Sequence, residues 1–289
     1  MNFGEAQTVA QALRGATGVL GAKTDSARFD AEVLMAHALG CSRSELFLRR
    51  MTDPVPPAFA QLVARRGAQE PVAYIVGCQG FYGLDLLVTP DVLIPRADSE
   101  VLVEAAIAAR PGAHRLLDCG TGSGALLLAV LAEMKNSSGL GMDRSEAALA
   151  VARTNAERLG LGDRASFALA DWHAPDWVSG IGKFDLILAN PPYVEDAAEL
   201  DATVRDHEPA AALFAGPEGL DDYRVLIPQL PALLTAGGAA LVEIGYTQAD
   251  AVSVIAGEAG FEALLHHDLG GRPRALELKI PLGKAGALA

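Results

Sequence analysis

A strand, a glycine-rich turn and a helix follow one another in residues 115–130, and this succession constrains the fold more than any other feature. The pattern predicts a short apolar strand over 115–118, the turn over 119–124 and an apolar helix from 125. Glycines let a backbone pass close to a ligand, and a helix N-terminus offers free N–H groups. This order is typical of a nucleotide-binding βαβ unit. The spacing is Gly-x-Gly-x-Gly, so a tight turn without a ligand is the alternative.

Two later predicted strands are followed by acidic residues. The strand over 139–143 ends in Asp143, at about the offset where an acid accepts hydrogen bonds from both hydroxyls of a ribose. The alternative for Asp143 is a cap for the helix that starts near Ser145. The strand over 165–169 is followed by Asp171 and Trp172. An acid can accept from an adenine amine and an indole can cover the base, although a buried Trp is also a common core residue.

The four residues Asn190-Pro191-Pro192-Tyr193 follow a fourth apolar run, 184–189. Both prolines lack an N–H and have a fixed φ, so the Asn190 side-chain oxygen and the Pro191 carbonyl can face one point. A planar –NH2 group needs two such acceptors, and Tyr193 offers a flat face on which a planar group can stack. The loop therefore predicts a site that holds an amide or an exocyclic amine. A plain turn is the alternative, because Asn-Pro and Pro-Pro are common turn signals.

Together these four segments are more specific than any one of them. All lie at carboxyl ends of predicted strands, where open α/β sheets bind ligands. The chain lacks the Gly-x-x-x-x-Gly-Lys-[Ser/Thr] pattern of P-loop nucleotidases. The order resembles the S-adenosylmethionine-dependent methyltransferases of the Rossmann-like class. Within that class, Asn-Pro-Pro-Tyr is the form found in enzymes that methylate glutamine amides or adenine N6.

Composition excludes several other classes of protein. The 289 residues are 51% hydrophobic, which is enough for one large domain or two smaller ones. No apolar run reaches the roughly 18 residues of a membrane helix, and the N-terminus has no signal-peptide pattern. The three cysteines and six histidines show no metal-ligand spacing, so we expect a cytoplasmic protein without a metal. The net charge of −13 argues against a broad nucleic-acid surface and suits a basic protein partner.

The chain divides into three predicted parts. Residues 1–70 show helical spacing at Phe29, Val33, Ala36 and Leu39, and predict a small helical bundle for substrate recognition. Two strand-like runs, 70–77 and 81–89, predict a β-hairpin linker over 71–95. Residues 96–289 form the predicted methyltransferase domain.

Several longer segments resemble one family of proteins. These are Glu-Pro-Val-Ala-Tyr-Ile-Val-Gly at 70–77, Leu-Ile-Pro-Arg-Ala-Asp-Ser-Glu at 93–100, and the segments 204–209, 219–224 and 271–274. They resemble the peptide-chain release factor glutamine N5-methyltransferases of the HemK type. The departures are Ala97, usually Pro, Cys119, often Leu, and His207, often aromatic. None of the three touches the expected core chemistry.

The resemblance implies a fold, a reaction and a set of site residues. The fold is α/β, a Rossmann-like seven-stranded methyltransferase domain preceded by a small all-α bundle and a linking β-hairpin. The reaction moves a methyl group from S-adenosylmethionine, leaving S-adenosylhomocysteine, to the glutamine of the Gly-Gly-Gln motif in class I release factors. Asn190, Pro191 and Tyr193 are the implied catalytic residues, and 190–193 would hold the substrate. The implied cofactor-binding residues are Gly120, Thr121, Gly122, Ser123, Gly124, Asp143, Trp172 and Asn190.

Three other functions stay open at this point. The same loop would serve an enzyme that methylates a glutamine of a ribosomal protein. It would also serve an adenine N6-methyltransferase acting on nucleic acid, against which the net charge counts. A cofactor-binding protein without activity is the third, and the intact Asn-Pro-Pro-Tyr argues against it. We expect a monomer, with no membrane and no direct nucleic-acid partner.

Overall fold

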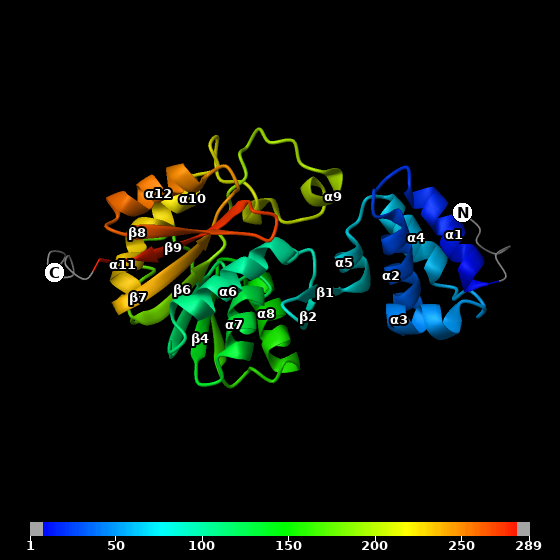
Figure 1. Cartoon of the computed structure of the whole chain (residues 1–289), viewed down its shortest axis with the longest axis horizontal. Helices are drawn as coiled ribbons and strands as arrows, with labels where there is room; N and C mark the ends of the chain where they lie inside the picture. The colour runs from blue at the N-terminus through cyan, green and yellow to red at the C-terminus, as the bar shows by residue number, and fades with distance from the viewer. Residues whose placement is uncertain (1–7, 282–289) are drawn as a thin grey trace. The chain divides into compact units, whose positions relative to one another are not determined.

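The computed structural model describes residues 8–281, which fold into two compact units (Figure 1). Of the described residues, the first unit contains 8–78 together with Leu200–His207, and the second contains Gln79–Glu199 and 208–281. The second unit is therefore interrupted by a short segment that belongs to the first. Each unit has its own buried apolar core.

The first unit is entirely helical. Its helices are α1 (Val9–Leu20), α2 (Ala27–Leu39), α3 (Arg43–Glu45) with the π-helical turn η2 (Leu46–Arg50), α4 (Phe59–Gly67), α5 (Val72–Val76) and α9 (Ala202–Arg205). Thr8 caps α1 through a capping box, and Gly40, in the left-handed conformation, ends α2. Inside the unit Arg66 forms a buried ion pair with Asp30, with 2.6 Å between Nε and Oδ2.

The predicted helical spacing at Phe29, Val33, Ala36 and Leu39 is confirmed by helix α2, although these residues are not equally buried. Phe29 is 52% exposed, whereas Ala31, Leu34 and Met35 are fully buried. The Asp30 side of α2 faces α4, where Asp30 pairs with Arg66, and Phe29 lies outside this contact. Phe29 lies under the guanidinium of Arg43, 4.4 Å from its ring centroid.

The strand expected over 70–77 is wrong, because Val72–Val76 forms helix α5. Its β-branched residues favour a strand, but burial of Ile75 in the helical core outweighs that local preference. The hairpin is formed one run later, by β1 (Cys78–Phe81) and β2 (Leu84–Leu87). Tyr82 and Gly83 both have positive φ at its turn, as a tight two-residue hairpin loop requires.

The second unit is built on a seven-stranded sheet. Its strands are β3 (Arg115–Cys119), β4 (Ser138–Asp143), β5 (Ala165–Leu169), β6 (Phe184–Ala189), β7 (Leu234–Glu243), β8 (Glu262–His267) and β9 (Pro273–Lys279). The strand order is β5-β4-β3-β6-β7-β9-β8, and β9 alone runs opposite to the other six strands. The order reverses between β3 and β6, which makes the carboxyl ends of these two strands the expected place for a ligand.

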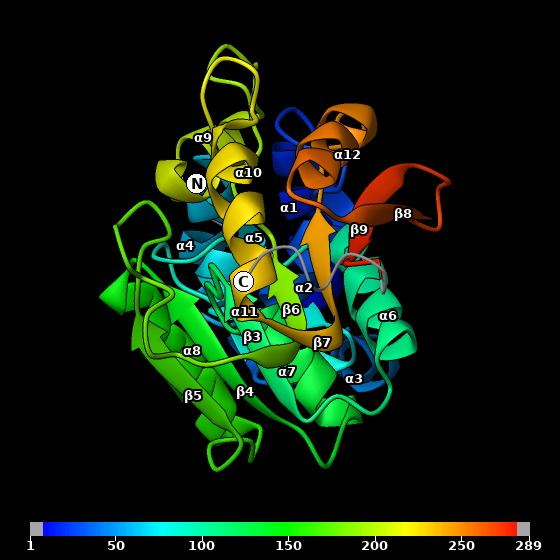
Figure 2. The same ribbon diagram turned by 90° about the vertical axis from the view of Figure 1, so that its left-hand side faces the viewer.

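Helices cover both faces of this sheet. One face carries α6 (Glu100–Ala109), α7 (Ala125–Glu133) and α8 (Glu146–Arg158), and the other carries α10 (Asp221–Leu226), α11 (Leu230–Leu233) and α12 (Ala249–Glu258) (Figure 2). Short 3-10 turns lie at Ala97–Ser99, Ala210–Ala212 and Ile227–Gln229. The central strands β3 and β6 and most of β7 are buried on both sides, so they are nearly continuous apolar runs rather than alternating ones. The four strands and the α/β class predicted from the sequence are confirmed.

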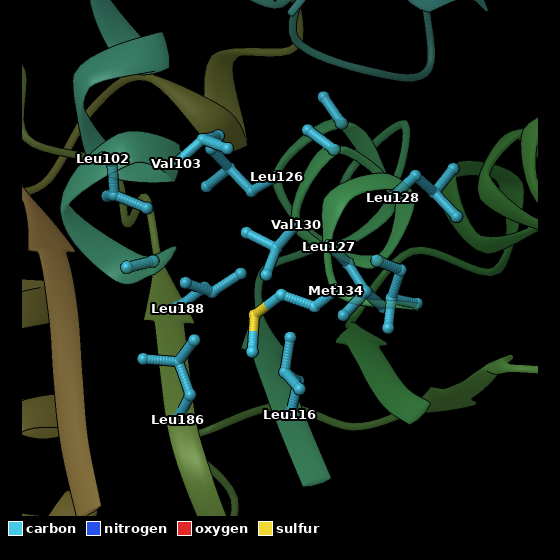
Figure 3. Packing of buried hydrophobic residues seen from close by; sticks show 14 of the residues in the cluster. Leu102, Val103, Leu116, Leu126, Leu127, Leu128, Val130, Met134, Leu186 and Leu188 are labelled. Atoms are coloured by element: carbon cyan, nitrogen blue, oxygen red, sulfur yellow. The ribbon is translucent and has the colours of Figure 1, made fainter. Parts of the chain in front are cut away.

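The core on the α6–α8 face is formed largely by leucines. Figure 3 shows Leu116 of β3 and Leu186 and Leu188 of β6 facing the side chains of α7. Leu127 is fully buried, and its Cδ1 occupies the space beside Gly139, where an added Cβ would lie only 2.4 Å away. The glycine of β4 thus lets α7 pack directly on the sheet.

Leu127→Ala is expected to lower the free energy of unfolding by about 2–5 kcal/mol, because it leaves a cavity that the rigid sheet cannot close. Urea denaturation followed by tryptophan fluorescence measures this, since both tryptophans, Trp172 and Trp177, lie in the second unit. The control is Leu269→Ala, at a fully exposed leucine, which should change stability by no more than about 0.5 kcal/mol. Equal effects of the two changes would contradict the packing described above.

Candidate active site

A cavity lies at the carboxyl ends of the central strands of the second unit. It is lined by residues that follow β3, β4, β5 and β6, by the segment before α6, and by the turn Ala210–Ala212. Of the residues singled out in the sequence, those in the lining are Gly120, Thr121, Gly122, Ser123, Asp143, Asp171, Trp172, Asn190 and Pro192. Gly124, Pro191 and Tyr193 are not in the lining. The chain thus brings most of the candidate residues together from four separate loops.

The glycine turn leaves room for a ligand because its glycines have no side chains to fill the cavity. Gly120 has a φ of +75°, and a Cβ there would lie 3.0 Å from the indole of Trp172. Gly122 has a φ of +53° with open space around its Cα. Residues with side chains rarely adopt such angles, so glycine is required at both positions. The turn forms a cradle that a Cβ would narrow.

A buried carboxyl lies beneath this turn. Asp118 is 1% exposed, and its Oδ2 accepts a hydrogen bond of 2.6 Å from the Thr121 hydroxyl. Its Oδ1 has no partner among residues 8–281. Burial raises the pKa of Asp118 to about 7, an effect that the Thr121 hydrogen bond opposes. In the sequence Asp118 is seen only as the end of a strand, although an acid immediately before a glycine turn is a signal that it could serve the site.

Asp143 fixes the glycine turn from the neighbouring strand. Its Oδ2 accepts a 2.9 Å hydrogen bond from the Gly122 N–H, and its Oδ1 accepts one from the Ser145 N–H. Ser145 itself caps α8, accepting from the Ala148 N–H. The capping role considered for Asp143 therefore belongs to Ser145.

The Trp172 side chain forms the part of the cavity wall beside the glycine turn and is held by neighbouring side chains. Its Nε1–H donates to Asp222 Oδ1 over 2.8 Å, and the His173 ring nitrogen lies 2.9 Å from the same oxygen. The Gln229 side chain donates to the Trp172 carbonyl over 3.1 Å. These contacts fix the indole plane next to Gly120. Nothing in the local sequence pointed to Asp222, because it comes from α10, about fifty residues further along the chain.

Only some residues of the Asn-Pro-Pro-Tyr loop line the cavity. Asn190 is half-buried and Pro192 buried, and both line the cavity. The Tyr193 ring instead packs into the core of the α10–α12 face, where burial raises its pKa to about 12 and a hydrogen bond with Arg274 partly opposes this. The Tyr193 carbonyl accepts from Gln248 over 3.0 Å. Tyr193 thus anchors the loop, and its expected stacking on a substrate stays a prediction.

The remaining wall is held by two charged contacts. Glu208, buried, accepts from the Ile94 N–H over 3.1 Å and forms an ion pair with Arg96. Arg144 donates to the Ala211 carbonyl over 2.7 Å. The Glu208 contacts join the Leu-Ile-Pro-Arg segment to the residues just before the turn Ala210–Ala212, and the Arg144 bond joins that turn to the loop after β4; all of these segments border the cavity. Two of the segments that resemble the methyltransferase family therefore meet at the site.

Residues 8–281 contain neither a cluster of metal ligands nor a helix that could span a membrane. No group of three or more His, Cys, Asp and Glu side chains there could hold a metal ion. Within the same residues no helix has the length and apolar character needed to cross a membrane.

Comparisons with known proteins match most of the chain to one family. The family model described as PrmC N-terminal domain matches residues 11–77, and the one described as Methyltransferase domain matches 112–244. The release factor glutamine methyltransferase of Rhodospirillum rubrum is 42% identical over 91% of this chain and 82% of its own length. Its counterpart in Cereibacter sphaeroides is 42% identical over 94% of this chain and 98% of its own length. The release factor glutamine methyltransferase of Geobacter sulfurreducens is 40% identical over 89% of this chain and 91% of its own length.

Proposed function

Because the chain belongs to the release factor glutamine methyltransferase family, we propose that it methylates the side-chain amide nitrogen, N5, of a release factor glutamine. The substrate glutamine would be that of the Gly-Gly-Gln motif in class I release factors. The observation that carries the proposal is the position of Asn190, which lines the same cavity as the glycine turn. An amide bound at Asn190 would therefore lie beside a nucleoside cofactor.

The cavity fits S-adenosylmethionine as the cofactor. The glycine cradle and the indole wall of Trp172 offer close backbone approach and a flat apolar face, and the Oδ1 of Asp118, unpaired among the described residues, is buried beneath the turn. We propose that Gly120, Thr121, Gly122 and Ser123 hold the methionine part, Asp143 the ribose hydroxyls, and Trp172 with Asp171 the adenine. When bound, the cofactor supplies a methyl group on a positively charged sulfur, which is strongly electrophilic.

The protein's part in the reaction is to align and polarise the glutamine amide. An amide nitrogen is a weak nucleophile because its lone pair is delocalised into the carbonyl. The Asn190 side-chain oxygen and the Pro191 carbonyl would each accept one N–H of the –NH2 group and stabilise the positive charge that develops on nitrogen. Fixed dipoles of this kind favour the transition state over the ground state. They also hold the nitrogen within attack distance of the methyl group. The departing proton would pass to water.

We propose that the helical unit recognises the release factor. Three large apolar side chains are exposed on it: Phe29, Phe47 and Leu48, the last 81% exposed. Exposed apolar residues of this size are typical of protein interaction sites. The net charge of −13 would attract a basic partner by long-range steering. We further propose that the enzyme acts as a monomer in the cytoplasm.

The experiment that tests the function combines purified protein, S-adenosylmethionine and unmethylated class I release factor, followed by mass spectrometry of the Gly-Gly-Gln peptide. One added methyl group on the glutamine is the expected result. A release factor whose Gln is replaced by Glu is the control and should stay unmodified. An unmodified wild-type peptide, with cofactor binding shown by calorimetry, would overturn the proposal and direct the search to a ribosomal-protein glutamine.

A further inference from the structure

A buried glutamate lies directly behind Asn190. Glu243 ends β7, and the parallel pairing of Ala189 with Val242 makes Asn190 and Glu243 the next neighbours across the two strand ends. Glu243 is 1% exposed, and its carboxyl forms hydrogen bonds with the side chains of Ser99 and Asn190. Both of these partners line the cavity, whereas Glu243 does not. The carboxyl is therefore separated from the cavity by the two side chains it holds.

We infer that Glu243 is a positioning residue that fixes the Asn190 side chain with its amide oxygen toward the cavity, an inference that rests on the function proposed above. An ionised carboxylate can only accept hydrogen bonds, so Asn190 must give it the –NH2 end of its amide. The carbonyl end then points away from Glu243. The –NH2 group of a substrate glutamine needs an acceptor in the cavity, which the Asn190 amide oxygen provides. If the Asn190 amide were reversed, its own –NH2 group would face the –NH2 group of the substrate, and neither could accept a hydrogen bond.

Within residues 8–281, one oxygen of the Glu243 carboxyl accepts no hydrogen bond. Oε2 has no hydrogen-bond partner among the described residues. The charged and titratable groups facing it are Arg274 of β9, Asp98 before α6, Tyr193 after β6 and Tyr223 of α10. Arg274 is itself bonded to Asp98 over 2.8 Å and to Asp268 over 3.3 Å. Arg274 is thus shared among several acids and does not neutralise Glu243 alone.

Protonation of Glu243 should abolish this orientation. Burial raises the pKa of Glu243 to about 7, although the hydrogen bonds from Ser99 and Asn190 and the charge of Arg274 lower it. Below that pH the carboxyl carries a proton and can donate to the Asn190 oxygen, which turns the oxygen away from the cavity. Because the active form is the ionised one, kcat should rise as the pH increases through about 7 and then level off.

The first test is kinetic and compares Glu243→Gln with wild-type enzyme. A carboxamide can donate as well as accept, so we expect kcat to fall ~10²-fold, the scale of a misplaced catalytic contact. Cofactor affinity should change less than about 3-fold, and the rise of kcat through pH 7 should disappear. Combined with Asn190→Ala, the change should cause no further loss, because residues that act as one unit are not additive.

The matched control is Glu277→Gln. Glu277 is a similarly buried glutamate on β9 that pairs with His266 and Lys279 and does not line the cavity. The kcat of the Glu277→Gln variant should match that of the wild-type enzyme. Urea denaturation of each variant separates a loss of folding from a loss of orientation. Wild-type kcat in Glu243→Gln, or a loss that multiplies with that of Asn190→Ala, would overturn the inference.

A second test does not depend on activity. In ¹⁵N spectra the side-chain –NH2 signal of Asn190, assigned by its absence in Asn190→Ala, should shift with pH around 7 in wild-type protein and stay constant in Glu243→Gln. A signal that does not respond to pH in wild-type protein would overturn the inference even if release factor proved not to be the substrate. Inactivity of the wild-type enzyme toward release factor, with the pH-dependent shift present, would instead count against the proposed function alone.

Discussion

Asn190→Ala is expected to lower the rate of glutamine methylation by ~10²-fold or more, because it removes a preorganised acceptor from the reacting amide. The loss should be in kcat, since the contact is stronger when charge develops on nitrogen. Single-turnover transfer of labelled methyl groups from S-adenosylmethionine to release factor measures this step without product release.

Binding of S-adenosylhomocysteine is the control for this variant. The cavity walls formed by the glycine turn, Asp143 and Trp172 are all retained, so affinity should change far less than kcat. The peripheral variant Asn136→Ala, at an exposed position beyond α7, should behave like wild type. Turnover near the wild-type rate in Asn190→Ala would refute the role of Asn190 in holding the glutamine.

Asp143→Ala is expected to weaken the binding of S-adenosylhomocysteine by on the order of 10²-fold, measured by isothermal titration calorimetry. Each hydrogen bond to a charged group contributes about 1.5–3 kcal/mol, and a ribose would lose its carboxylate acceptor. The change also frees the Gly122 and Ser145 N–H groups, so the glycine turn loses its support from β4.

Two other variants make this prediction specific. Asp143→Asn keeps one acceptor oxygen and should show an intermediate loss of affinity. Asp163→Ala removes an exposed acid of the same unit and should bind as wild type does. If Asp143→Ala and Asp163→Ala bind the ligand equally well, Asp143 does not contribute to the cofactor site.

The local sequence pattern was sufficient to predict the parts of the fold that depend mainly on local interactions. The central strands are continuous apolar runs, and the turn after β3 needs glycines because three of its residues, Gly120, Gly122 and Gly124, have positive φ. Such features can be predicted without knowledge of tertiary neighbours. Helix α5 could not, because its sequence favours a strand and only contact with the helical core decides otherwise.

The residues that support the site were missed for a related reason. Asp222, Glu208 and Glu243 act on Trp172, Ile94 and Asn190, from which they are separated by at least fifty positions in the chain. No spacing rule connects such pairs. Only the order of the strands and the packing of α10 bring them together, and neither can be obtained from composition or periodicity.

The assignment of Leu200–His207 to the helical unit has a consequence for how the protein is made. Helix α9 lies in this segment, and its Thr203 accepts a hydrogen bond of 3.4 Å from Arg66. During synthesis the N-terminal helices emerge from the ribosome long before α9 does, so this unit cannot be completed until His207 has been translated. A fragment ending at Cys78 would lack α9, and exchanging the N-terminal region between relatives would require transplanting two separate stretches of gene.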